Sequence, residues 1–225
     1  MSDTEPDDLD ALIRRVDPDR WLSSRFIGDA VRRADVIALY AYDHELARAP
    51  RIASNALLGE IRLTWWREAL DEIFEGRPIR HHPAVQALAR AVERRNLPRA
   101  ALEAMNDARY RELDPSPMTE LEALDWARDT GGRCAELAAS VLDPATDARL
   151  AQAGGEAWVF SMRFRDDGAK RPALDHLIVA ARSASRSLSV EAFPAVAHAT
   201  LAGRPAMSDL SKRLRLILAV GRGRL

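Results

Sequence analysis

A chain of 225 residues, 47% of them hydrophobic and 30% charged, has the composition of a folded globular protein, not of a disordered or membrane-spanning one. Its formal net charge of −1 argues against a nucleic-acid partner, which would favour a strongly positive surface. The single cysteine, Cys134, has no partner for an intramolecular disulfide, and no uncharged apolar run approaches the roughly 20 residues that cross a bilayer. We therefore expect a cytoplasmic protein, at most peripheral to the inner face of a membrane.

The sequence predicts helix almost throughout. Ala, Leu, Arg and Glu dominate, β-branched alternating runs are almost absent, and short connections marked by proline, Pro50 among them, separate the segments. The expected helices span roughly residues 25–48, 54–76, 83–95, 98–113, 118–142, 147–165, 172–189 and 207–220. Residues 1–18 are expected to form an acidic, partly flexible segment, and residues 19–225 a single all-α domain packed as a helical bundle.

The segment from Ser54 to Gly76 has the clearest helical pattern. Apolar residues at helical spacing predict one buried stripe, formed by Leu58, Ile61, Trp65, Ala69 and Ile73. Further apolar residues widen this stripe, namely Leu57, Trp66, Leu70 and Phe74. We therefore expect this helix to be covered by other elements on two sides.

Residues 38–51 read ALYAYDHELARAPR and contain the first acidic candidates. Asp43 and Glu45 stand two apart, so on a helix they point to different sides and cannot share one ion. A helical magnesium site is usually built from carboxylates at i and i+4, but the residues four positions later are alanines. The residue pattern alone favours an exposed acidic patch in which Arg48 pairs with Glu45.

Several segments together resemble the squalene/phytoene synthase family over nearly the whole chain. They are ALYAY at 38–42, WREAL at 66–70, HPAVQAL at 82–88, ARYRELDPSPMTELEALDWARDTGG at 108–132 and AFPAVAHATLA at 192–202. The resemblance implies the all-α isoprenoid-synthase fold, in which helices surround a deep apolar cavity. It also implies, for active members, head-to-head joining of two prenyl diphosphates with Mg²⁺ held by two Asp-x-x-x-Asp motifs.

Both acidic motifs of the family are altered in this chain. When the family's first motif is laid on Ala41-Tyr42, its two aspartates fall at Ala47 and Arg51. The nearest match to the second motif begins at Asp166, and Lys170 stands where its partner carboxylate belongs. Metal ligands are therefore expected to be lost, with Asp166 as the one candidate ligand if the chain is active.

Cations in place of carboxylates still allow a diphosphate to be held directly. Without Mg²⁺, however, ionisation of a diphosphate leaving group loses its electrostatic stabilisation. Two further residues, Asp107 and Arg163, are candidates either for a buried ion pair or for the pocket. The residues that we expect at the pocket or diphosphate site are Tyr42, Asp43, Glu45, Arg51, Asp107, Arg163, Asp166 and Lys170.

The run from Asp43 to Ala47 fits best a divergent branch of the family, which includes a mitochondrial assembly factor for respiratory complex I. The resemblance thus favours a catalytically degenerate protein that needs no cofactor. Such a protein would bind a prenyl lipid, a prenyl diphosphate or a protein partner, and would act in respiratory-complex assembly. The alternative is an active Mg²⁺-dependent prenyl transferase of isoprenoid biosynthesis.

Other motifs have structural interpretations. His81-His82-Pro83 has no second ligand pair and reads as a loop ahead of a helix. The pairs Gly131-Gly132 and Gly154-Gly155 are expected to permit close helix packing or to line the cavity floor. The basic, amphipathic residues 207–225 either pack on the domain or lie on an anionic membrane surface.

Overall fold

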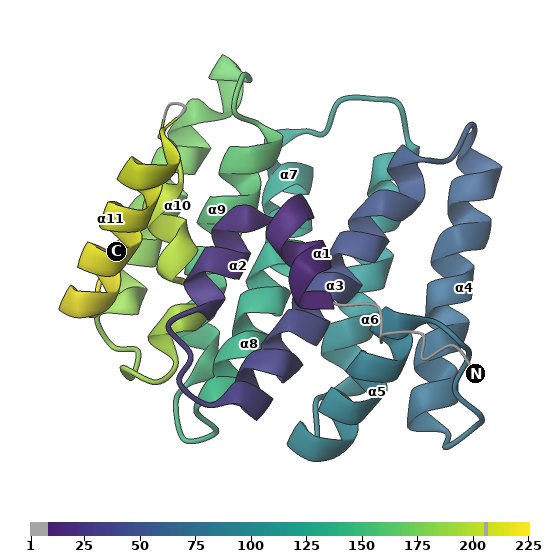
Figure 1. Cartoon of the computed structure of the whole chain (residues 1–225). Helices are drawn as coiled ribbons and strands as arrows, with labels where there is room; N and C mark the ends of the chain where they lie inside the picture. The colour runs from purple at the N-terminus through teal and green to yellow at the C-terminus, as the bar shows by residue number, and fades with distance from the viewer. Residues whose placement is uncertain (1–8, 205–206) are drawn as a thin grey trace.

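A computed structural model describes residues 9–204 and 207–225 as one bundle of helices (Figure 1). The α-helices are α1 (Leu9–Val16), α2 (Pro18–Ser24), α3 (Ala30–Arg51), α4 (Ala56–Phe74), α5 (Pro83–Arg95), α6 (Arg99–Ala108), α7 (Glu120–Ala127), α8 (Arg133–Leu142), α9 (Gln152–Arg163), α10 (Arg171–Ser185) and α11 (Asp209–Arg222). A π-helical turn joins α7 to α8 at Arg128–Gly132, and 3₁₀ turns lie at Arg109–Leu113, Ala148–Ala151, Gly168–Lys170, Phe193–Ala195 and Ala197–Leu201. The predicted all-α class is confirmed.

Helix α3 is the centre of the bundle. It begins after Asp29, whose side chain accepts hydrogen bonds from two backbone amides of the first turn. It packs against α1, α4, α5 and α8, and a continuous run from Asp35 to Asp43 is buried. Contrary to expectation, α3 does not stop before Pro50 but ends at Arg51, because proline near a helix end keeps a helical φ and removes only one backbone hydrogen bond.

Two helices precede α3 that the sequence analysis did not assign. Ile13 of α1 is fully buried against the core, and α1 lies across α3 (Figure 1). Asp17 then caps α2 by accepting a hydrogen bond from the amide of Arg20, and Pro18 occupies the first helical position. The acidic segment 1–18 therefore contains an ordered helix from residue 9, while residues 1–8 lie outside the described part.

The predicted buried stripe of α4 is largely wrong. Leu58, Ile61 and Trp65 are 41%, 55% and 36% exposed, whereas the inward face is formed by Gly59, Leu63, Trp66, Ala69 and Leu70. Helix α4 lies at one edge of the bundle and packs mainly on α3 and α6 (Figure 1). Because its neighbours lie on one side, most of the first half of its wide apolar surface faces outward.

The π-helical turn and α9 cross at unusually short range. A Cβ on Gly155 would lie 2.0 Å from the carbonyl oxygen of Gly131, and one on Gly131 would lie 2.6 Å from the carbonyl oxygen of Gly155. Neither position can therefore carry a side chain without moving backbone. The expectation that these glycines permit close packing is confirmed.

Helix α11 closes the side of the bundle opposite α4 (Figure 1). Ser208 caps its N-terminus, Leu216 and Ala219 are buried, and Lys212 forms a 2.8 Å ion pair with Asp19 of α2. Residues 209–222 therefore pack on the domain, which was one of the two arrangements expected for residues 207–225. No helix among the described residues has the length and apolar character to cross a membrane.

Candidate functional site

A cavity of about 660 Å³ opens beside the start of α2, the second half of α3 and the end of α9. Three of the residues expected at the pocket line it: Asp43 and Arg51 from α3 and Arg163 from α9. Ala47 lines it as well, so the two positions at which the resemblance placed the family's first pair of aspartates both face this cavity. Its apolar wall includes Trp126, Trp158 and Met162.

Asp43 is buried at the cavity floor between two arginines. One carboxylate oxygen is 2.8 Å from a guanidinium nitrogen of Arg20, and the other accepts a hydrogen bond of 2.6 Å from Arg109. Arg20 also pairs with Asp17 at 2.5 Å, and Arg109 pairs with Glu112 at 2.7 Å. The five side chains, three carboxylates and two guanidiniums, form one network of ion pairs in which both oxygens of Asp43 are already engaged.

Burial alone would raise the pKa of Asp43, because the charged form is harder to solvate inside the protein. The guanidiniums of Arg20 and Arg109 outweigh that effect and lower the pKa of Asp43 to about 2. The carboxylate is therefore ionised at neutral pH, and its negative charge is compensated by ion pairs with the two arginines.

Aromatic rings fix Arg20 in place. Its guanidinium lies 4.9 Å from the ring centre of Tyr40 and 4.8 Å from that of Trp158, and it donates a 3.4 Å hydrogen bond to the sulfur of Cys134. Burial raises the pKa of the Cys134 thiol to about 12, so the sulfur stays protonated and unreactive. This packing holds the cation in one orientation.

Sequence reasoning missed both arginines of this network. Arg20 and Arg109 are two of 31 arginines, and Arg109 is 66 positions away from Asp43. The only local signal was the Asp17-Pro18 pair, which marks a helix start and places Arg20 three residues after the capping aspartate. Nothing in the spacing indicated that two distant cations would meet on Asp43.

The mouth of the cavity carries cations without acidic partners. Arg51 and Arg163 are exposed, and within residues 9–204 and 207–225 neither forms a salt bridge. Arg163 stacks on the ring of Phe164 at 5.5 Å. Both guanidiniums are therefore available to an anionic ligand that enters the cavity.

The second altered motif lies in an adjacent groove of about 630 Å³, which shares Arg163 and Met162 with the cavity. Asp166 and Lys170 line this groove, but Lys170 pairs with Asp167 at 2.7 Å and lies over the ring of Phe164. Lys170 therefore does not face the cavity mouth beside Arg51.

The remaining candidates lie elsewhere. Tyr42 is fully buried and donates a 3.0 Å hydrogen bond to the carbonyl oxygen of Leu102, so it belongs to the core. Glu45 faces the other side of α3 and pairs with Arg48 at 3.3 Å as expected, but the exposed acidic patch is wrong because Asp43 is buried. Asp107 is paired with Arg67 between α6 and α4. The acidic candidates consequently do not converge on one point.

The squalene/phytoene synthase family matches residues 13–166, which is more than half of the chain. The chain belongs to the squalene/phytoene synthase family. A solved structure, described as a dehydrosqualene synthase in complex with ligand, superposes with a TM-score of 0.76 over 95% of this chain and 94% of the other. At 12% sequence identity this likeness shows the shared fold alone.

The chain is similar in sequence to proteins of cattle (Bos taurus) and human (Homo sapiens) that are named NADH dehydrogenase (ubiquinone) complex I, assembly factor 6. Each is 30% identical over 120 residues, and the rat (Rattus norvegicus) protein of that name is 30% identical over 132 residues. The matched segment is 53% of this chain but only 35% of the cattle and human proteins.

The donor set at the cavity of this family member does not fit a magnesium ion. Each acidic side chain of its lining has a cationic partner within 2.8 Å: Asp17, Asp19, Asp43 and Glu112. Among the residues that the structure describes, no group of three or more His, Cys, Asp or Glu side chains is placed to hold a metal ion. Magnesium would need free carboxylates, and here guanidinium and ammonium groups occupy them.

Proposed function

We propose that this chain is a non-catalytic member of its family that binds one prenyl diphosphate in the cavity and assists assembly of a respiratory NADH dehydrogenase. The observation that carries the proposal is the engagement of Asp43 by Arg20 and Arg109. With Ala47 and Arg51 at the cavity instead of carboxylates, the chain lacks the ligands of a first metal site.

Catalysis by the family route requires stabilisation of a leaving diphosphate. Metal ions do this by bridging carboxylates and phosphate oxygens, so that the developing charge is neutralised in the transition state. Arg51 and Arg163 can hold a bound diphosphate, but binding energy that is the same in the ground state and the transition state does not accelerate ionisation.

The cavity lining supports an amphiphilic anion as the ligand. Arg51 and Arg163 have no acidic partner among the described residues and suit a diphosphate, which guanidinium groups bind through paired hydrogen bonds. Trp126, Trp158 and Met162 offer apolar contact to the start of a prenyl chain.

The assembly role is supported by the likeness to the proteins named complex I assembly factor 6. It requires a protein partner, and co-purification of NADH dehydrogenase subunits with this chain from its host tests that requirement. The alternative, an active Mg²⁺-dependent prenyl transferase, is supported by the likeness in fold to a dehydrosqualene synthase.

Binding of farnesyl diphosphate, measured by calorimetry with and without Mg²⁺, tests the proposed ligand. We expect binding that does not depend on Mg²⁺ and that the double variant Arg51→Gln/Arg163→Gln weakens by roughly ten-fold or more, since each hydrogen bond to a charged group contributes about 1.5–3 kcal/mol.

The matched control is Arg62→Gln/Arg90→Gln, which removes two exposed arginines of α4 and α5 and leaves the cavity unchanged. Binding that needs Mg²⁺, or that falls equally in the control variant, would contradict the proposed site.

A further inference from the structure

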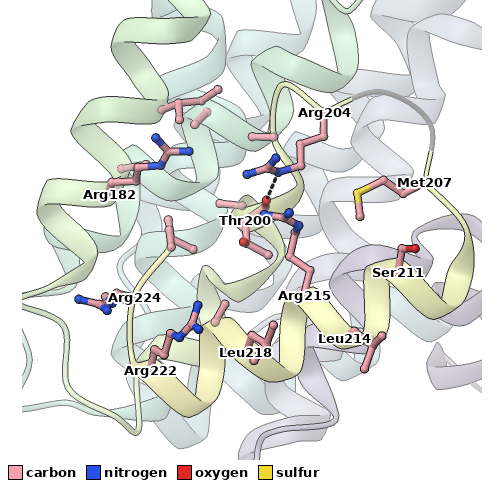
Figure 2. Close-up of a pocket in the computed structure, with 17 residues that line it drawn as sticks. Arg182, Thr200, Arg204, Met207, Ser211, Leu214, Arg215, Leu218, Arg222 and Arg224 are labelled. Atoms are coloured by element: carbon pink, nitrogen blue, oxygen red, sulfur yellow. Dashed lines mark hydrogen bonds between the residues drawn. The ribbon is translucent and has the colours of Figure 1, made fainter.

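A second groove, of about 570 Å³, lies between α10 and α11 and has different lining residues from the central cavity (Figure 2). Five arginines line it and come from three parts of the chain: Arg182 from α10, Arg204 after the last 3₁₀ turn, and Arg215, Arg222 and Arg224 from α11 and the residues that follow it. Figure 2 shows Arg204 and Arg215 close together beside Thr200, with Arg182 reaching towards them from α10.

These five arginines differ from many other arginines of the chain, which form salt bridges with carboxylates. Within the described ranges none of the five forms a salt bridge, and the terminal carboxylate of Leu225, which also lines the groove, is not within salt-bridge distance. Among the described residues, the only hydrogen bond that the side chains of these five arginines donate is the 3.3 Å bond from Arg204 to the carbonyl oxygen of Thr200. The groove therefore concentrates positive charge that the protein itself does not neutralise.

Like charges held together destabilise each other. Burial lowers the pKa of Arg204, and the neighbouring guanidiniums of Arg215 and Arg182 lower it further. An anion placed between these side chains would relieve that repulsion. Guanidinium forks bind the oxygens of a phosphate through paired hydrogen bonds, so a phosphate group matches both the charge and the geometry.

The groove also has an apolar side. Leu214 and Leu218 line it, and Leu210 and Ile217 on the same helix are 68% and 53% exposed. Helix α11 thus presents leucines and isoleucine to solvent beside the arginine cluster, while its Leu216 faces the core. Exposed apolar side chains next to basic ones are typical of helices that lie in a membrane interface.

We propose that this groove binds the phosphate headgroup of an anionic lipid at a membrane surface. Arg182, Arg204 and Arg215 hold the phosphate, and Leu210, Leu214 and Ile217 contact the upper part of the acyl region. Charge complementarity selects an anionic headgroup over a zwitterionic one. The site is separate from the central cavity and holds whether or not that cavity binds a prenyl diphosphate.

Co-sedimentation of the full chain with vesicles tests the site. The vesicles are phosphatidylcholine alone or phosphatidylcholine with phosphatidylglycerol, and the key variant is Arg204→Gln/Arg215→Gln. We expect the wild type to bind only the vesicles with phosphatidylglycerol. The variant should bind them roughly ten-fold more weakly or worse, because each basic residue near an anionic surface contributes about a five-fold increase in partition.

The control variant Arg62→Gln/Arg90→Gln carries the same net charge but leaves the groove intact, and circular dichroism checks that both variants remain helical. Equal loss in the two variants, or equal binding to both kinds of vesicle, would overturn the proposal. A third outcome is binding of inorganic diphosphate that depends on Arg204 and Arg215, with no binding to vesicles. That result would contradict the proposal that the ligand is a lipid and would assign the groove to a soluble phosphate compound.

Discussion

Asp43 is an ionised carboxylate at the cavity whose two oxygens are held by arginines. It lies where an acidic ligand would be sought, in the helix that faces the cavity, yet both of its oxygens contact arginines. A carboxylate in that state contributes to the stability of the interior, and a metal ion placed on it would bring a further positive charge against the two buried guanidiniums.

Substitution of Asp43 should therefore destabilise the fold strongly. Asp43→Asn leaves Arg20 and Arg109 buried without their shared anion, and loss of one partner from a buried charge network costs about 3–5 kcal/mol. Urea unfolding measures the change in the free energy of unfolding. Asp175→Asn is the control, because Asp175 pairs with Arg171 on an exposed face of α10, where such pairs contribute about 0.5 kcal/mol or less.

The same network gives a pH dependence with a defined sign. The pKa of Asp43 is lowered to about 2 in the folded protein, against about 3.9 in the unfolded chain. The stability that it contributes, about 2–3 kcal/mol, is fully present above about pH 4 and is lost as the pH falls towards 2. The difference between wild type and Asp43→Asn should narrow over that interval. A constant difference would contradict the assigned network.

At the scale of elements, local sequence predicts where most of the helices lie, but it does not predict which side of a helix is buried. Periodicity identified α4 as a helix, yet Leu58, Ile61 and Trp65 face outward because α3 and α6 cover only one side of it. A pattern with apolar residues around most of a helix does not say which side its neighbours occupy. Likewise, α1 was not assigned, because only one fully buried residue, Ile13, anchors this short helix.

The crossing of α9 with the π-helical turn was foreseen more successfully, because glycine pairs directly indicate close backbone approach. Gly155→Ala should destabilise the fold by about 1–3 kcal/mol or more, since its Cβ would press on the carbonyl oxygen of Gly131. In contrast, Gly221→Ala in α11 meets nothing within 4 Å and should stabilise by about 0.5–1 kcal/mol. Thermal and urea unfolding of both variants measure these changes, and equal effects would contradict the crossing.

For the whole molecule, the sequence predicted the fold and the family, because the quoted motifs extend along most of the chain. It also placed Ala47 and Arg51 at positions that line the cavity. It could not predict the Asp43 network, which needs Arg20 and Arg109 from distant elements, nor the separation of Glu45 and Asp107 from the cavity. Contacts between residues far apart in the chain depend on packing that spacing does not encode.

The arrangement in space gives three surfaces of different character. The central cavity lies between α2, α3 and α9, the arginine-rich groove lies at α10 and α11, and exposed apolar residues lie on α4 at the opposite edge (Figure 1). Lys212 of α11 lines the cavity, whereas Arg215 of the same helix lines the groove. A lipid bound in the groove would therefore contact the helix that also borders the cavity.

The central claim, that the cavity binds but does not turn over a prenyl diphosphate, is tested most directly by incubation with farnesyl or geranylgeranyl diphosphate and Mg²⁺. The measured quantity is released diphosphate. We predict no release above that of buffer with Mg²⁺, in the wild type as in Asp166→Ala. Release by the wild type at a rate that falls in Asp166→Ala would contradict the account and identify an active prenyl transferase.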